Sequence, residues 1–326
     1  MPRTKRTRVN SDESRSAKKL KRSNSGTLDY MAQIQTALGI KQNMEGNENA
    51  VEHSSAVLTS TSNVKKDKDA IEHTPIALGS ISDKLLSIEQ ELCTKLQDIT
   101  FPSVIQYIYN PLEYASETHA MYVHKYCTGE KKVLFVGMNP GPWGMSQTGV
   151  PFGEINMVRN WLKICGPVKS PSKEHPDRKV TGFECTRSEI SGLRLWGLFR
   201  NLCGSPENFF RHAYMHNYCP LAFMDARARN ITPAELKGGQ KILHEACDKA
   251  LIDIIQLLKV EIIVGIGNYA EKRAQIAVQT GGLPNIQVMV LRHPSPRAVG
   301  NQNWNETAMQ RLDELGLLKF FEKADV

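Results

Sequence analysis

Four short β-rich runs, separated by stretches with helical periodicity, constrain the fold of this chain more than any other feature. The runs lie at 133–136, 214–217, 262–264 and 288–291. Strands that alternate with helices favour a mostly parallel sheet with helices on both faces. The sequence therefore predicts an α/β fold, a single three-layer α/β/α sandwich around a central, mostly parallel, four-stranded sheet.

Helices are predicted from apolar periodicity and from capping residues. An amphipathic helix is indicated by apolar residues at steps of three and four, at Leu85, Ile88, Leu92, Leu96 and Ile99. A helix is predicted to begin at Thr232, because a hydroxyl cap is followed by Pro233 and then by Glu235 at the third position. Further helices are predicted after Asn268 and Asn303.

The chain divides by composition into a tail, 1–80, and a domain, 81–326. The tail is rich in Ser, Thr, Asn and Lys, so we expect it to be disordered. Residues 1–22 hold nine Lys and Arg and two Asp and Glu, which leaves 32 of each sign elsewhere. The pI near 9.0 is therefore a property of the tail. A nucleic-acid surface on the domain must be a local patch.

Two basic clusters in the tail predict a nuclear location. Lys and Arg gather within 3–8 and within 18–22, in the pattern of a two-part nuclear address that doubles as a DNA-binding arm. A tail that only aids solubility is the alternative. The first residues do not resemble a secretory signal, and no apolar run has the roughly 18 residues that a membrane span needs. Seven cysteines without a CxxC pair favour a reducing compartment and argue against structural zinc.

Polar or small residues follow every predicted strand. They lie at 137–144, 217–220, 265–268 and 293–297. In parallel sheets, ligands bind beyond the carboxyl ends of the strands. These four segments are therefore predicted to converge on one site.

Each converging residue also has a structural explanation. Asn139 suits a turn, Asn217 a strand-end cap, and His293 a satisfied core histidine. The glycines Gly265 and Gly267 form part of a GxGxxA pattern, but no acidic residue lies about 20 positions on. Close backbone packing, or a phosphate at the helix N-terminus, explains them better than a dinucleotide.

Other catalytic patterns are missing from the sequence. It contains no GxSxG, GxxxxGK[ST] or HExxH motif, and no zinc-deaminase signature. Cys219 lies near His216 in the chain, but a buried cysteine at a strand end is favoured over a nucleophile.

Two motifs resemble those of a known enzyme family. GMNPGPWGMSQTGVPFGE at 137–154 and HPSPR at 293–297 are similar to the signatures of the single-strand-selective monofunctional uracil-DNA glycosylases, in the uracil-DNA glycosylase superfamily. The similarity extends over roughly 81–320.

The resemblance implies a reaction, a partner and a location. The enzyme would hydrolyse the bond between sugar and base for uracil and 5-substituted uracils such as 5-hydroxymethyluracil, in single- and double-stranded DNA. It would leave an abasic site for a downstream abasic-site endonuclease and have no lyase activity. The enzyme would need no metal or organic cofactor and would not bind a membrane. It would act in base excision repair as a monomer in the nucleus.

The resemblance also implies roles for the residues of the site. Asn139 would position the attacking water, and His293 would stabilise charge on uracil O2. Asn217 would read the base edge, and Phe152 would stack on the flipped base, although a plain core phenylalanine is the alternative. Gly141 would leave room beside C5 of the base.

Further residues are implied in the pocket wall and in DNA contact. Met138 and Met145 would complete the wall. The segment after the histidine would enter the duplex as a wedge, although an exposed loop is the alternative. The residues implied to contact DNA are Gly267, Asn268, Ser295, Arg297, Ala298, Val299, Gly300 and Asn301.

Two other functions stay open at this point. One is a mismatch-directed glycosylase of the same superfamily that prefers G·U or G·T pairs. The other is a non-catalytic protein that binds DNA damage, which the presence of Asn139 and His293 disfavours.

Overall fold

The computed structural model describes residues 79–321, so the predictions for the basic tail lie almost wholly outside the described residues. The first helix, α2 (Ile81–Gln97), begins where the folded domain is predicted to begin. Ser80 caps it, because its Oγ accepts a hydrogen bond of 3.1 Å from the N–H of Asp83. Leu85, Leu92 and Leu96 are buried, which confirms the predicted amphipathic helix.

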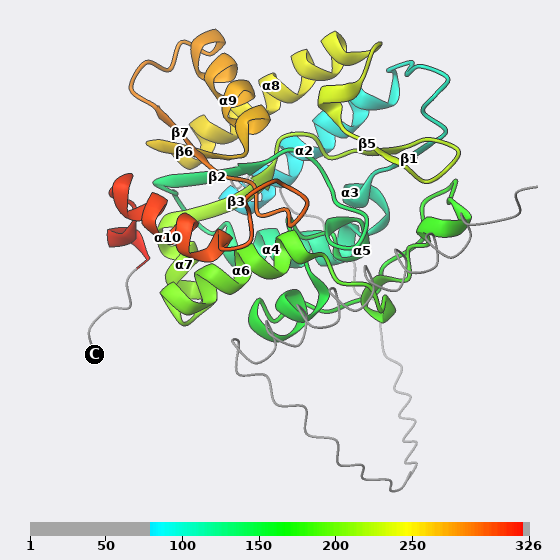
Figure 1. Ribbon diagram of the computed structural model, residues 1–326. Helices are drawn as coiled ribbons and strands as arrows, with labels where there is room; N and C mark the ends of the chain where they lie inside the picture. Colours follow the sequence, from blue (N-terminus) through cyan, green and yellow to red (C-terminus); the bar gives the residue numbers. More distant parts are fainter. Residues whose placement is uncertain (1–78, 322–326) are drawn as a thin grey trace, which may run out of the picture. The chain divides into compact units, whose positions relative to one another are not determined.

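The central sheet confirms the predicted architecture. It consists of β2 (Val133–Gly137), β3 (Ala213–Asn217), β6 (Ile262–Ile266) and β7 (Gln287–Leu291), all parallel, in the order β3-β2-β6-β7 (Figure 1). Every residue of β2 and β3 is buried. Parallel strands covered on both faces read as continuous apolar runs, which is why periodicity located them.

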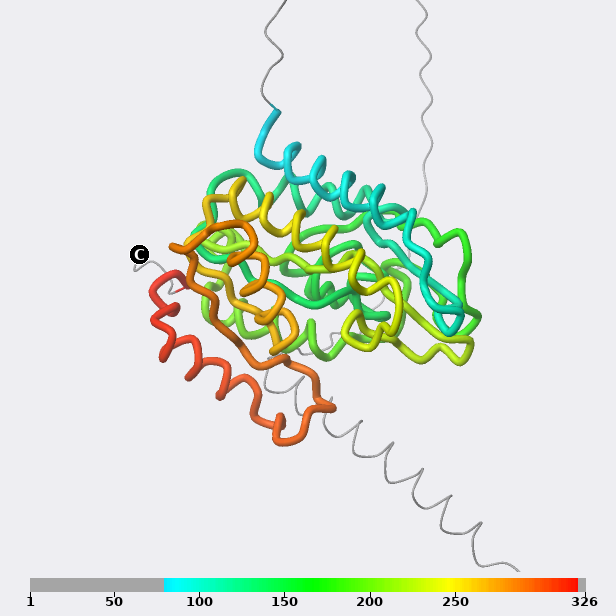
Figure 2. The backbone as a smooth tube through the Cα atoms, turned by 90° about the horizontal axis from the view of Figure 1, so that it is seen from above, coloured from blue at the N-terminus to red at the C-terminus, as the bar shows by residue number. Residues whose placement is uncertain are grey.

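Helices cover both faces of this sheet. One layer contains α2, α8 (Gln240–Leu258) and α9 (Asn268–Thr280), and α2 and α8 run side by side (Figure 2). The other layer contains α4 (Ser116–Tyr126), α6 (Ile190–Cys203), α7 (Pro206–His212) and α10 (Trp304–Glu314) (Figure 1). None of the helices within 79–321 is both long enough and apolar enough to cross a membrane.

Shorter elements connect these layers. They are the helices α3 (Pro111–Tyr114) and α5 (Met145–Thr148), a π-helical turn at Met157–Trp161, and 3-10 turns at Pro176–Arg178, Gly182–Glu184, Pro233–Glu235 and Leu318–Phe320. A small antiparallel sheet, β1 (Tyr107–Tyr109), β4 (Ala222–Met224) and β5 (Asn230–Ile231), was not predicted. Strands of two or three residues are too short to show a period.

The helix predicted to begin at Thr232 is wrong. The capping box is present, since the N–H and Oγ of Thr232 both donate to Glu235 Oε2 at 2.8 Å. The segment nevertheless forms only one 3-10 turn, and α8 begins at Gln240. Gly238 and Gly239 intervene, and Gly239 has a φ of +68°, which no right-handed helix accommodates.

A buried ion pair ties the outer helices to the sheet. His119 on α4 donates from Nε2 to Glu89 Oε2 at 2.7 Å and from Nδ1 to the carbonyl of Gly149 at 2.8 Å. Burial alone lowers the pKa of His119, but the Glu89 carboxylate outweighs it and raises that pKa above its ordinary value. His216 on β3 lies 3.6 Å from the other carboxylate oxygen, Oε1. The pair therefore links α2, α4 and the strand that ends in Asn217.

Candidate active site

The register of the sheet brings the predicted site residues together. Gly137, the last residue of β2, pairs with Asn217, the last residue of β3, so Asn139 follows at the same edge. A pocket of about 770 Å³ lies there. Of the predicted residues, its lining includes Met138, Asn139, Gly141, Phe152, Asn217, His293, Ser295 and Arg297.

The amide of Asn139 has a fixed orientation. Its Nδ2 donates to the carbonyl of Leu221 at 3.0 Å. A carbonyl accepts only, so this contact identifies the nitrogen and leaves Oδ1 as the acceptor. The residue lies in a bend just beyond β2, close to the structural alternative, and it also lines the pocket.

The amide of Asn217 is buried and incompletely paired. Its exposed fraction is 4%, Nδ2 donates to the sulfur of Met145 at 3.1 Å, and Oδ1 has no partner among the residues described. A thioether is a weak acceptor. Buried amide oxygens are nearly always paired, so the free one indicates a ligand. Gly137 makes this approach possible, because a Cβ there would lie 2.2 Å from Oδ1.

His293 is uncharged at neutral pH. Burial lowers its pKa to about 4. Its Nδ1 accepts a hydrogen bond of 3.1 Å from the N–H of Ser295, so the proton of the neutral ring is on Nε2. Because it lines the pocket, the residue is not a histidine sealed within the core.

Phe152 has a strained backbone that aims its ring at the pocket. Its φ is +52°, uncommon for a bulky residue, and its ring centroid lies 6.0 Å from that of His293. Helix α6 holds this conformation, because a Cβ on Gly192 would come within 2.0 Å of the Phe152 carbonyl oxygen. Trp196 also donates to the carbonyl of Pro151 at 3.2 Å.

The space beside Gly141 is occupied, which corrects the expectation of open room. A Cβ on Gly141 would lie 2.1 Å from Oε2 of Glu189, and one on Gly144 would lie 2.5 Å from the same oxygen. Burial, with the nearby charge of Glu154, raises the pKa of Glu189 to about 7. Nothing in the sequence distinguishes Glu189 from an ordinary residue preceding a helix.

The predicted wedge is a loop that is held by hydrogen bonds at its base and has an exposed tip. Val299 at the tip is 92% exposed and Arg297 is also exposed. Asn301 differs from the prediction, since its side chain is buried and Nδ2 donates to the carbonyls of His293 at 3.0 Å and Ser295 at 2.7 Å. Arg194 on α6 donates to the carbonyls of Pro294 and Asn301, so the loop has an anchor that the sequence did not reveal.

Of the eight residues predicted to contact DNA, only Ser295 and Arg297 line the main pocket. Gly267 and Asn268 line a neighbouring cavity of about 630 Å³, together with Ala298, and His293 borders both cavities. The preceding glycine, Gly265, serves close packing, because a Cβ there would lie 2.3 Å from the backbone nitrogen of Glu271.

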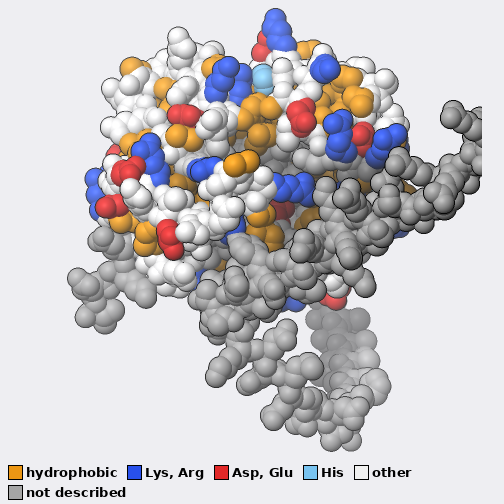
Figure 3. All heavy atoms as spheres, viewed as in Figure 1, with side chains coloured by type: hydrophobic (Ala, Val, Ile, Leu, Met, Phe, Trp, Pro, Cys, Tyr) orange, Lys and Arg blue, Asp and Glu red, His pale blue; other side chains and the backbone are white. Residues whose placement is uncertain are grey.

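Arginines surround the pocket mouth, and the sequence did not identify most of them. Arg178 and Arg187 lie over the ring of Trp143, 5.1 and 4.7 Å from its centroid. The arginines that line the pocket are Arg178, Arg227, Arg229 and Arg297. Elsewhere basic and acidic side chains are interspersed on the visible face (Figure 3). The cations therefore form a local patch, as expected when residues 23–326 carry equal numbers of basic and acidic side chains.

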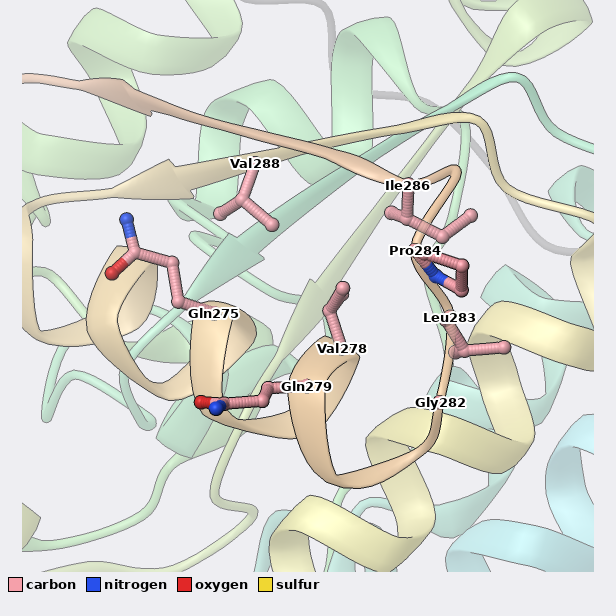
Figure 4. A pocket seen from close by; sticks show the side chains of 8 residues that line it. All are labelled: Gln275, Val278, Gln279, Gly282, Leu283, Pro284, Ile286 and Val288. Atoms are coloured by element: carbon pink, nitrogen blue, oxygen red, sulfur yellow. The ribbon is translucent and has the colours of Figure 1, made fainter.

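A further cavity offers little chemistry. It measures about 470 Å³, lies between α9 and β7, and is lined by Gln275, Val278, Gln279, Gly282, Leu283, Pro284, Ile286 and Val288 (Figure 4). None of these side chains titrates. Nor do three or more His, Cys, Asp or Glu side chains converge as metal ligands anywhere in 79–321.

Comparison with known proteins agrees with this geometry. The model of the uracil DNA glycosylase superfamily matches residues 124–314. The chain is 52% identical over 241 residues to the single-strand selective monofunctional uracil DNA glycosylases of Mus musculus and Bos taurus, covering 73% of this chain and 86% and 88% of theirs. Among solved structures, SMUG2 of Pedobacter heparinus shares the fold, with a TM-score of 0.52 at 18% identity, over 73% of this chain and 98% of that one. The chain thus belongs to the single-strand selective monofunctional uracil-DNA glycosylases, within the uracil-DNA glycosylase superfamily.

Proposed function

We propose that this protein is a monofunctional uracil-DNA glycosylase, which hydrolyses the bond between uracil and deoxyribose and leaves an abasic site. One observation carries the proposal. Asn139, Asn217 and His293 line a single pocket, in which a buried amide oxygen has no partner in the described part of the chain and the imidazole is neutral. The membership of the chain in this glycosylase family supports it independently.

Asn217 selects uracil by its hydrogen-bonding pattern. Its Oδ1 accepts from uracil N3–H, and its Nδ2 exchanges the sulfur of Met145 for uracil O4. Cytosine presents the reverse pattern, so both contacts fail. Each buried group left unpaired costs about 1–3 kcal/mol. The enzyme must flip the nucleotide out of the stack to present this edge, and Phe152 stacks on the flipped ring.

His293 stabilises the departing base. Its Nε2–H donates to uracil O2, where negative charge grows as the glycosidic bond breaks. A donor that is already in place within a buried site stabilises such charge more than water does.

Asn139 orients the nucleophile. Its Oδ1 accepts from a water molecule and holds it against the anomeric carbon. An amide is not a strong base, so departure of the base must lead and the sugar becomes oxocarbenium-like before the water attacks. Lysine is not among the residues that line the pocket, which supports an enzyme without a Schiff-base step.

The partner in this proposal is DNA, both single- and double-stranded. The arginines around the mouth suit phosphates, and the exposed Val299 suits insertion where the base has left. The substrate range includes 5-substituted uracils, and a downstream abasic-site endonuclease acts next. The basic tail directs the enzyme to the nucleus.

The test is alkali-dependent cleavage of an oligonucleotide that contains one uracil. Purified protein should release free uracil, and the strand should break only after alkali treatment. Uracil release is then compared for matched oligonucleotides that contain single-stranded U, U·A, G·U or G·T. A mismatch-directed enzyme would act on the G·U and G·T duplexes alone. Binding to abasic DNA without any uracil release would overturn the proposal in favour of a damage-binding protein.

A further inference from the structure

Glu189 directs its carboxyl into the active-site wall instead of capping its own helix. It occupies the N-cap position of α6 but makes no side-chain cap hydrogen bond. The carboxyl instead faces the backbone of Trp143 and Gly144, whose N–H groups act to lower its pKa against the larger effect of burial. Its Oε2 is shielded from solvent, has no hydrogen-bond partner within residues 79–321, and lies where a side chain of residue 141 would begin. The residue also lines the pocket.

The order of atoms in uracil places its C5 edge against this wall. With O2 at His293 and N3 and O4 at Asn217, C5 is the next ring atom after C4 and lies on the side away from O2. Gly141, Pro142 and Trp143 line the pocket, and Met145, at the end of the same segment, contacts Asn217, so this segment forms the wall on that side. Glu189 packs on this segment at Gly141 and Gly144.

We propose that Glu189 is the specificity-determining residue for substituents at C5 of the base: its carboxyl, seated where Gly141 lacks a side chain, binds polar substituents and rejects methyl. This inference rests on the proposed function. A hydroxymethyl group both donates and accepts hydrogen bonds, and a formyl group only accepts. A methyl group does neither and would cover the carboxyl without satisfying it. The polarity of this wall, and not empty space, thus sets the substrate range.

The two polar substituents differ in the protonation state that they need. A hydroxymethyl group bonds to either form of the carboxyl, whereas a formyl group needs the protonated form as donor. The pKa of Glu189 is raised to about 7, so its carboxyl changes protonation state near neutral pH. Excision of 5-formyluracil relative to uracil should therefore fall as the pH rises through 7. The charged and titratable groups around Glu189 are Glu154 behind it and, across the pocket, Arg178, Arg227, Arg229, His293 and Arg297.

The experiment measures single-turnover excision of uracil, 5-hydroxymethyluracil, 5-formyluracil and thymine, each opposite guanine, at pH 6 and pH 8. Uracil carries only hydrogen at C5 and reports the basal reaction. In Glu189→Ala, the ratio of 5-hydroxymethyluracil to uracil should fall by about tenfold or more. In Glu189→Gln, an amide N–H donor is present at every pH. The ratio of 5-formyluracil to uracil should therefore be independent of pH, while the wild-type ratio falls between pH 6 and pH 8.

The control is Glu184→Gln, the same change at a carboxylate whose side chain is 90% exposed, and it should leave every ratio unchanged. Equal losses on all four substrates in Glu189→Ala would show that the carboxyl only supports the loop. The same pH dependence in wild type and Glu189→Gln would overturn the proposal even if the alanine variant failed to fold. Wild type that releases no uracil would instead refute the proposed function.

Discussion

At the scale of single residues, the chemistry depends on a histidine that stays neutral. Burial holds the pKa of His293 near 4, below the ordinary value of 6.5. Uracil excision should therefore persist as the pH falls through 6.5 and decline only towards pH 4. The single-turnover rate between pH 4.5 and pH 8 measures this. A decline centred near 6.5 would show that the imidazole titrates as if it were exposed.

Substitution of Asn139 tests whether this residue positions the attacking water. Asn139→Ala should lower the rate of uracil release by roughly 100-fold or more, because the water loses its fixed position. Affinity for uracil-containing DNA should change little, since the residue holds no part of the base. Single-turnover rates and fluorescence anisotropy separate the two effects. Activity equal to wild type would remove Asn139 from the mechanism.

Some residues of the site could be predicted from sequence and others could not. Asn139, Asn217 and His293 each lie at or just beyond the carboxyl end of a strand, and the carboxyl ends of parallel strands meet. Glu189 contacts a loop more than 40 residues earlier in the chain, and no local pattern encodes that contact. Asn301 is local to the motif, yet its amide points inward to hold the loop.

At the scale of elements, the buried pair of Glu89 and His119 holds helices against the site. Glu89→Gln leaves the imidazolium without its counter-charge, which should lower the free energy of unfolding by about 3–5 kcal/mol. Urea denaturation at pH 6 measures this. Glu91→Gln, at an exposed carboxylate paired with Lys95, is the matched control and should leave stability almost unchanged.

The same pair predicts how stability depends on pH. The pKa of His119 is raised in the folded protein, so its contribution is complete below 6.5 and is lost as the pH rises through the folded value. The free energy of unfolding of the wild type should therefore fall as the pH rises above 6.5, and that of Glu89→Gln should fall less. Parallel pH dependences in the two proteins would mean that the pair is not ionised.

Elements were predictable where a long pattern encoded them. The buried strands β2 and β3 and the amphipathic helix α2 each carry a clear apolar signal. The capping residues at Thr232 were predicted correctly, but the backbone becomes extended at Leu236 after a single turn, and Gly239 then precedes α8. Local caps start a helix only if the following residues can continue it.

At the scale of the whole molecule, charge is divided unevenly along the chain. The first 22 residues carry the entire net positive charge, and the remainder is balanced. Removing residues 1–78 should make the slope of log affinity against log salt concentration shallower. Excision at saturating DNA should stay the same, because the site lies within the remaining part. Anisotropy titrations at several salt concentrations test this, and identical slopes would show that the tail does not touch DNA.

In the proposed mechanism, Asn139, Asn217 and His293 surround one flipped uracil. A crystal structure of the Asn139→Ala variant with uracil-containing DNA tests it most directly. We expect uracil N3 and O4 at the amide of Asn217, O2 within hydrogen-bonding distance of His293 Nε2, and the glycosidic bond facing residue 139. A base seated in the cavity beside Gly267, or still stacked in the helix, would contradict it.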